Sequence, residues 1–148
     1  MTRETDLIKL YSQRILELAA DIPYLERLDD PDATAKKRSP LCGSTISVDL
    51  KISDGRISEF GQDVKACALG QAAAAVVGEA IIGRTQDELQ TARNQLKNML
   101  IADGPVPDPP FDGFEVLIPA REFKNRHASI MLALDASLAA MNEYCETV

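Results

Sequence analysis

The chain has 148 residues, of which 45% are hydrophobic and 26% charged, and its formal net charge is −7. This size and composition predict one globular domain over residues 1–148, and an acidic surface argues against general nucleic-acid binding because it repels phosphate. The longest apolar stretch, Ala72 to Val77, is too short to span a bilayer, and the polar start MTRETDLIKL does not have the pattern of a signal peptide, so we expect a cytoplasmic protein with no membrane partner.

The first predicted elements are a helix and a short strand. Asp6 to Ala20 predicts a helix, because its apolar residues recur at helical spacing. That stripe comprises Ile8, Tyr11, Ile15 and Leu18. Pro23 ends the segment. Ala33 to Ser39 predicts a short polar strand closed by Pro40, and its run Lys36-Lys37-Arg38 is typical of a solvated edge.

The clearest local pattern is a β-hairpin. Residues 45–52 alternate polar and apolar side chains, which indicates a half-buried strand. The apolar positions are Ile46, Val48, Leu50 and Ile52. Asp54-Gly55 predicts a tight turn, and a second strand returns from Arg56 to about Asp63. Its apolar anchors are Ile57 and Phe60. The alternation is imperfect around Gly61, where we expect a bulge.

Two helices are predicted next. Ala68 to Ile82 is apolar on most sides, so we expect it to lie buried against the sheet, with Gly83 as its C-terminal stop. Thr85 and Glu88 form a T-x-x-E capping box that opens the following helix. Its apolar face comprises Leu89, Ala92, Leu96, Met99 and Leu100. The run Asp103-Gly104-Pro105 ends it.

The last third of the chain predicts a loop and a final helix. Gly104 to Pro110 holds four prolines and reads as an extended loop. Phe114 to Leu117 favours a helical turn, and Asn125 is a candidate cap for the last helix. That helix carries a stripe of Ile130, Met131, Leu134, Leu138 and Met141. The order of elements predicts an α+β fold, a small antiparallel sheet of two to three strands with helices packed on one face.

The three cysteines, Cys42, Cys67 and Cys145, form no CxxC pair, which argues against a disulfide framework and a zinc ribbon. Cys42 precedes the hairpin and Cys67 follows it, so we expect the two to be neighbours in space. Cys67 also starts a helix, where the helix dipole favours the thiolate that binds metals. Cys42 taken alone favours a small hydrophobic residue at the start of a strand, and the convergence of the two cysteines is what points to a functional site.

His127 is the only histidine. Beside an apolar stripe it is typical of a hydrogen-bonded structural residue, and the alternative is a third metal ligand if the start of the last helix packs near the cysteines. No phosphate-binding glycine loop, HExxH or GxSxG motif is present. A Cys–His pair would have no orienting partner. We therefore expect a protein that is not an enzyme.

Several of these features together resemble a known family. The run Cys42-Gly43, the hairpin, Cys67-Ala68-Leu69 and the alanine-rich helix up to Gly83-Arg84 are similar to the U-type iron–sulfur cluster scaffolds, which include IscU and the N-terminal domain of NifU. The last helix from Ser129 to Ala136 resembles theirs as well. The resemblance implies a scaffold that receives sulfur from a cysteine desulfurase and passes a cluster to acceptor proteins, with Cys42 and Cys67 as ligands.

This chain departs from the family pattern at three positions. The family has an aspartate where this chain has Ser44. It has a histidine or lysine followed by a third cysteine where this chain has Ala128 and Ser129. His127 lies one residue before that pair, so a one-residue shift would bring it to the ligand position. Cys145, far along the last helix, is a poor substitute for the third cysteine.

Three hypotheses follow from the sequence. The first is a divergent scaffold or carrier that binds iron or a [2Fe–2S] cluster through Cys42 and Cys67, with His127 as a third ligand or with two protomers of a homodimer sharing one cluster. The second is a binding module of the same fold without a cluster, which docks on a cysteine desulfurase or an acceptor. The third is a mononuclear zinc or iron site formed by Cys42, Cys67 and His127.

Overall fold

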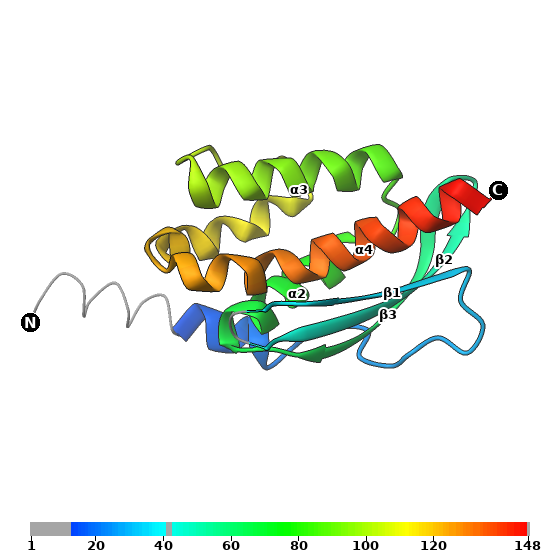
Figure 1. Ribbon diagram of the computed structural model, residues 1–148, viewed down its shortest axis with the longest axis horizontal. Helices are drawn as coiled ribbons and strands as arrows, with labels where there is room; N and C mark the ends of the chain where they lie inside the picture. The colour runs from blue at the N-terminus through cyan, green and yellow to red at the C-terminus, as the bar shows by residue number, and fades with distance from the viewer. Residues whose placement is uncertain (1–12, 41–42, 148) are drawn as a thin grey trace, which may run out of the picture.

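The computed structural model describes residues 13–40 and 43–147. Its strands form one three-stranded antiparallel sheet in the order β1-β2-β3, and helices α2, α3 and α4 lie to one side of that sheet (Figure 1). The strands are β1 Ala33–Arg38, β2 Thr45–Ser53 and β3 Arg56–Lys65. This arrangement confirms the predicted α+β fold, and β1 lies at an edge of the sheet, as its basic run indicates.

The β2–β3 hairpin forms as predicted, because Asp54 and Gly55 both adopt positive φ, 54° and 76°, as the favoured two-residue turn requires. The expected bulge at Gly61 is wrong. Gly61 pairs regularly with Asp49, and the register shifts instead between Lys51 and Ile52. A Cβ on Gly61 would lie 2.5 Å from the carbonyl oxygen of Glu26, so glycine is needed there because another part of the chain crosses the strand.

That crossing segment, residues 24–28, changes the burial of the sheet. The sequence predicts that Asp49 lies on a solvated face, but the structure leaves it only 1% exposed. Its carboxylate accepts hydrogen bonds from Arg27 Nε at 2.6 Å, from Leu28 N at 3.0 Å and from Thr34 Oγ1 at 2.7 Å. The half-buried interpretation of β2 is therefore wrong at Asp49 and at Ser47, which is also buried.

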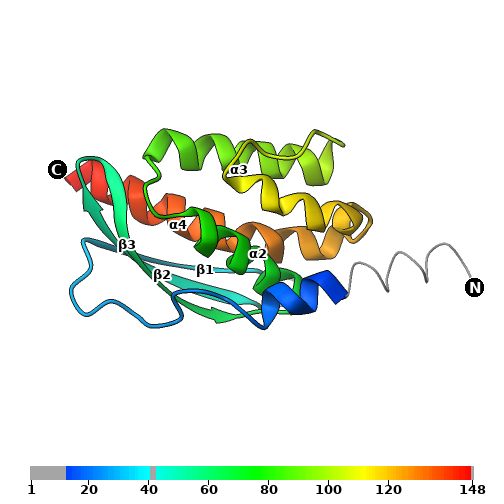
Figure 2. The same cartoon turned by 180° about the vertical axis from the view of Figure 1, so that it is seen from behind.

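The helical layer is built around the last helix. Its elements are α2 Ala68–Ala80, α3 Gln86–Ile101, the 3-10 helices η1 Phe111–Glu122 and η2 Lys124–Arg126, and α4 His127–Thr147. Helix α4 packs on β1 and β2 with one side and on α2 and α3 with the others (Figures 1 and 2). Helix α2 is almost wholly buried, as predicted, but it packs mainly on α4 and η1 rather than on the sheet.

The apolar stripes predicted for the helices are confirmed. The buried positions in α3 are Leu89, Ala92, Leu96, Met99 and Leu100. In α4 they include Ile130, Met131, Leu134, Leu138 and Met141. A helical segment over residues 13–19 buries Ile15 and Leu18, whereas Ile8 and Tyr11 of the same predicted stripe lie outside the described residues.

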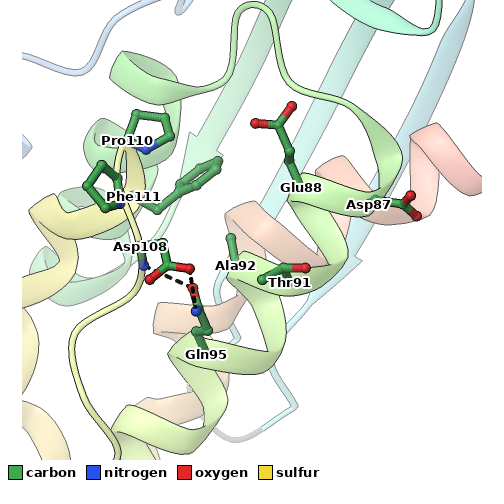
Figure 3. Close-up of a pocket in the computed structure, with 9 residues that line it drawn as sticks. Asp87, Glu88, Thr91, Ala92, Gln95, Asp108, Pro110 and Phe111 are labelled. Atoms are coloured by element: carbon green, nitrogen blue, oxygen red, sulfur yellow. Dashed lines mark hydrogen bonds between the residues drawn. The ribbon is translucent and has the colours of Figure 1, made fainter.

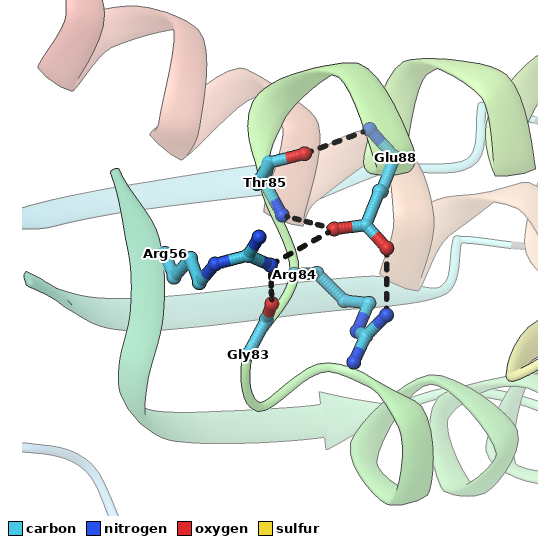
Figure 4. Close-up of polar contacts among 5 residues, drawn as sticks. All are labelled: Arg56, Gly83, Arg84, Thr85 and Glu88. Carbon is cyan, nitrogen blue, oxygen red and sulfur yellow. Dashed lines mark hydrogen bonds and ion pairs between the residues drawn. The ribbon is translucent and has the colours of Figure 1, made fainter. Parts of the chain in front are cut away.

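The start of α3 is fixed by the predicted capping box. Thr85 Oγ1 accepts from Glu88 N at 3.2 Å, and Thr85 N donates to Glu88 Oε1 at 3.1 Å. The Glu88 carboxylate also accepts from Arg84 at 2.6 Å, and Arg56, directly after the hairpin turn, donates to the Gly83 carbonyl at 2.9 Å (Figure 4). These contacts tie the hairpin turn to the α2–α3 connection.

The connection from α3 to α4 is partly as expected. The predicted extended loop lies along α3, where Gln95 and Asp108 exchange two hydrogen bonds of 3.0 Å (Figure 3). The predicted turn at Phe114 to Leu117 lies within the longer helix η1. The predicted cap at Asn125 is wrong, because Asn125 lies inside η2, which runs directly into α4. Within residues 13–40 and 43–147, no helix has the length and apolar character needed to cross a membrane.

Candidate functional site

The candidate site lies at the open end of the β2–β3 hairpin. Thr45 at the start of β2 pairs with Lys65 at the end of β3, so the residues just before and just after the hairpin are neighbours. Ser44 precedes it and Cys67 follows it. The hairpin thus brings its two outer ends together, as the sequence predicts. Cys42 itself lies outside the described residues, so its proximity to Cys67 stays a prediction.

Three side chains from distant parts of the chain meet at this end. Ser129 Oγ, on the first turn of α4, lies 3.4 Å from Cys67 Sγ and 3.1 Å from Ser44 Oγ. Ser129 is fully buried and Ser44 is 3% exposed, whereas Cys67 is half-buried. The three form one hydrogen-bonded cluster, the Ser44–Ser129–Cys67 cluster, in which the sulfur is the member nearest to solvent.

Local structure fixes Cys67. It is the N-cap residue of α2, with extended backbone geometry (φ −66°, ψ 171°) and no capping hydrogen bond from its side chain. The Gln71 side chain donates to the Ala66 carbonyl at 2.8 Å and so closes the turn before Cys67. Gly70 makes room for Ser129, since a Cβ at position 70 would lie 2.6 Å from Ser129 Oγ. The sulfur is therefore left available for other contacts.

The β1–β2 connection positions Ser44. Ser39 N donates to the Ser44 carbonyl at 2.8 Å, and Gly43 N donates to the Ser39 carbonyl at 2.9 Å. Gly43 has φ +71°, a conformation that a glycine adopts without strain. These bonds fix the two ends of the segment that carries Cys42.

His127 is held elsewhere. Its Nε2 lies 3.1 Å from the carbonyl oxygens of both Ala120 and Arg121, so this nitrogen carries the proton and donates to them. His127 and Ser129 are two positions apart on α4, which turns their side chains about 200° from one another around the helix axis. The structure therefore brings Ser44, Cys67 and Ser129 together and sets His127 against the end of η1.

Among residues 13–40 and 43–147, the other acidic and thiol groups form no second metal site. Cys145 is exposed, and it follows Ser129 by 16 positions on α4, which is about 24 Å along the helix. Asp87, Glu88 and Asp108 line a pocket between α3 and the loop that follows it (Figure 3). Among the described residues, no three His, Cys, Asp or Glu side chains are grouped so as to hold a metal ion.

Sequence reasoning missed the hydrogen bonds of the candidate site. Ser44 and Ser129 are identified from the sequence only as substitutions of expected ligands, and nothing in their spacing predicts that they bond to each other. Their shared chemistry is the available signal, because two hydroxyl residues replace two ligands beside the two remaining cysteines, Cys42 and Cys67. The role of Gly70 has no sequence signal of its own inside an alanine-rich helix.

The chemistry of the cluster follows from its atoms. A half-buried thiol is a soft ligand, which as a thiolate matches iron in a sulfur-bridged cluster. The hydroxyls of Ser44 and Ser129 are harder and are already bonded to each other. The described part of the site therefore offers one ligand of the expected type, with two hydroxyl groups behind it.

Comparisons with known proteins bear on the family and the fold of the chain. The family model of the NifU-like N terminal domain matches residues 10–147. The crystal structure of a nitrogen-fixing NifU-like protein (N-terminal) from Brucella abortus superposes with a TM-score of 0.92 at 41% identity, over 98% of this chain and 99% of that one. The iron-sulfur cluster assembly scaffold protein IscU of Thermotoga maritima is 28% identical over 90 residues, which are 61% of this chain and 63% of that protein, so the match spans less than two thirds of the relative's length.

A more distant structure shares the fold alone. The putative iron-sulfur cluster assembly scaffold protein for the SUF system from Fervidobacterium islandicum superposes with a TM-score of 0.79 at 17% identity, over 90% of this chain and 98% of that one.

Proposed function

Because the chain belongs to the family of the NifU-like N-terminal domain, we propose that it takes part in iron–sulfur cluster assembly by holding iron or a [2Fe–2S] cluster through Cys42 and Cys67. In this role it receives sulfur from a cysteine desulfurase and passes the cluster to acceptor proteins. The iron and sulfide are its cargo, and the role is that of a scaffold or carrier rather than an enzyme.

The Ser44–Ser129–Cys67 cluster carries the proposal. The family resemblance implies ligands at the positions of Cys42, Ser44, Cys67, Ala128 and Ser129. Three of these side chains, those of Ser44, Cys67 and Ser129, lie within 3.4 Å of a neighbour in the cluster. That spacing is close to the separation of two ligands on one tetrahedral metal ion, about 3.3–3.8 Å for bonds of 2.0–2.3 Å. The spacing of the three side chains therefore suits a ligand site, in which the sulfur of Cys67 is the soft ligand.

A [2Fe–2S] cluster needs four ligands, usually thiolates, and two cysteines supply half of them. In our proposal a second protomer supplies the other two thiolates. His127 is the alternative third ligand, at the cost of its hydrogen bonds to the carbonyls of Ala120 and Arg121. It would have to turn from η1 toward Cys67.

Anaerobic reconstitution with ferrous iron and sulfide tests the proposal. We expect visible cluster absorbance, with acid-labile sulfide, in the wild-type protein. We expect its loss in Cys42→Ala/Cys67→Ala. Cys145→Ala is the matched control, because it removes an exposed thiol distant from the site and should change nothing. Equal absorbance in the double variant and the wild type would overturn the proposal, and one equivalent of zinc or iron without sulfide would favour a mononuclear site.

The buried hydroxyls favour a second candidate, a module of the same fold that docks on a desulfurase or acceptor without holding a cluster. Ser44 and Ser129 bond to each other where the family has ligands. Capture of a purified cysteine desulfurase by metal-free protein, undiminished in the double cysteine variant, would support this candidate. In Ser44→Asp/Ser129→Cys, which returns a carboxylate and a thiolate to the site, we expect longer cluster retention than in the wild type if the serines are what weaken binding.

A further inference from the structure

We infer that Ser129 is a positioning residue for the sulfur of Cys67, because its buried hydroxyl can accept a hydrogen bond from the thiol and donate one to the thiolate. Ser129 thus acts from behind the sulfur rather than as a ligand to iron. The consequence for a bound cluster rests on the proposed function. The hydrogen bond to the sulfur is independent of that function, and it can be tested on metal-free protein.

The first support is the geometry of the fully buried Ser129. Its Oγ has contacts on two sides, Ser44 Oγ at 3.1 Å and Cys67 Sγ at 3.4 Å. A hydroxyl has one proton to donate and two lone pairs to accept with. When its proton points to Ser44, the Cys67 S–H donates to Ser129, so the hydrogen bonds run from the thiol inward.

The second support is what happens when Cys67 loses its proton. A thiolate sulfur can only accept, so the Ser129 proton turns toward Sγ, and Ser129 Oγ can in turn accept from the Ser44 hydroxyl. The hydrogen bonds then run from Ser44 outward to the sulfur. Only hydroxyl hydrogens move, and the three heavy atoms keep their places. The cluster can therefore stabilise the thiol and the thiolate without rearranging the fold.

The third support is that Ser129 is held in place by packing. Gly70 on α2 faces it, and a Cβ there would lie 2.6 Å from Ser129 Oγ and 2.8 Å from Ala66 Cβ. The hydroxyl thus occupies space that a side chain at position 70 would take. Because a hydroxyl is a poorer ligand for cluster iron than a thiolate, the position of Ser129 Oγ suits a hydrogen-bond donor to the sulfur.

A donor to a ligand sulfur affects a bound cluster in a known direction. Reduction adds negative charge that is shared by the sulfur ligands, and a hydrogen bond to one of them stabilises the reduced form. Ser129 should therefore raise the reduction potential of a cluster bound through Cys67.

The test on metal-free protein uses the Raman S–H stretch in Cys42→Ala/Cys145→Ala, where Cys67 is the only thiol. In this background we expect Ser129→Ala to shift the stretch to higher frequency, because the thiol loses its acceptor. Gly70→Ala should give the same shift by displacing the hydroxyl. Ser137→Ala is the control, since Ser137 is an equally buried serine of α4 that bonds to the Ala133 carbonyl instead. An unchanged stretch in both variants, with circular dichroism showing them folded, would overturn the inference.

The test on loaded protein is the reduction potential of the reconstituted cluster in otherwise wild-type chains. We expect Ser129→Ala to make it more negative and Ser137→Ala to leave it unchanged. An equal potential in all three proteins would refute the positioning role. If the wild type builds no cluster, the proposed function fails. The Raman result still decides whether Cys67 and Ser129 are hydrogen-bonded.

Discussion

The carboxylate of Asp49 joins the sheet to the segment that crosses it, and Asp49→Asn removes its charge with little change in shape. The side chain is 2% exposed. It accepts four hydrogen bonds, two from Arg27 at 2.6 and 2.8 Å, one from Leu28 N at 3.0 Å and one from Thr34 Oγ1 at 2.7 Å. We expect the substitution to lower the free energy of unfolding substantially.

The magnitude follows from which bonds survive. The asparagine oxygen can still accept from Leu28 or Thr34, but its NH₂ group faces the Arg27 guanidinium, a donor against a donor. A hydrogen bond to a charged group contributes about 1.5–3 kcal/mol. Arg27 is 47% exposed, so water screens the ion pair and re-solvates the freed cation. We therefore expect a loss of about 2–3 kcal/mol, or about 5–10 °C in Tm for a chain of this size.

The loss should also depend on pH. The hydrogen bonds from Arg27, with smaller help from Thr34 and Leu28, hold the pKa of Asp49 below its usual range, although burial acts in the opposite direction. A carboxyl whose pKa is lower in the folded state stabilises the protein above its unfolded pKa, about 3.9, and this contribution disappears as the pH falls through the folded pKa. The difference between wild type and Asp49→Asn should therefore be full at pH 7 and shrink below about pH 4.

Urea denaturation followed by circular dichroism, at pH 7 and at pH 3, measures both effects. The control is Glu17→Gln, the same chemical change in an exposed ion pair with Arg14, whose side chains are 54% and 56% exposed. It should change the free energy of unfolding by less than about 0.5 kcal/mol. The reasoning fails if Asp49→Asn is as mild as this control at pH 7, or if its effect is the same at both pH values.

Two further substitutions test local features of the fold by thermal melts. Gly61→Ala should lower the free energy of unfolding by about 2 kcal/mol or more, because the new Cβ would lie 2.5 Å from the backbone oxygen of Glu26. The control is Gly113→Ala, whose Cβ would meet only side-chain carbons at 3.3 Å or more and which should cost less than half as much. Equal effects would contradict the explanation that residues 24–28 cross the strand at Gly61. Thr85→Ala should cost about 1 kcal/mol by removing the hydrogen bond to Glu88 N, and a Tm within 1 °C of wild type would show that the capping box contributes little.

The elements that the sequence predicts well have causes that lie within a few residues of each other. Alternation over residues 45–52 and the Asp54-Gly55 turn are enough to define the hairpin, because strand period and turn conformation are local properties. The capping box at Thr85 and the five-residue stripe of α3 are likewise local, and all their predicted positions are confirmed.

The predictions that are wrong have causes far away in the chain. Asp49 is buried because residues 24–28, which have no periodic pattern, cross the sheet at Gly61. Imperfect alternation at Gly61 predicts a bulge, but the glycine is needed because the backbone at Glu26, 35 positions earlier, crosses the strand there. Asn125 is a good cap by composition, but η2 continues into α4 and leaves no cap position there.

The candidate site depends on both local and distant parts of the chain. The sequence predicts that the hairpin brings its two outer ends together, and Ser44 and Cys67 lie at those ends, but Ser129 comes from α4, 62 positions after Cys67. Serine and cysteine are similar in size, so a serine at position 129 fills the place of a thiol without leaving a cavity that would disturb the packing. What changes is the chemistry, since a hydroxyl donates to the neighbouring sulfur where a thiolate would bind iron. For the proposed scaffold role, we therefore expect cluster retention, rather than stability, to distinguish this chain from relatives with a full set of ligands.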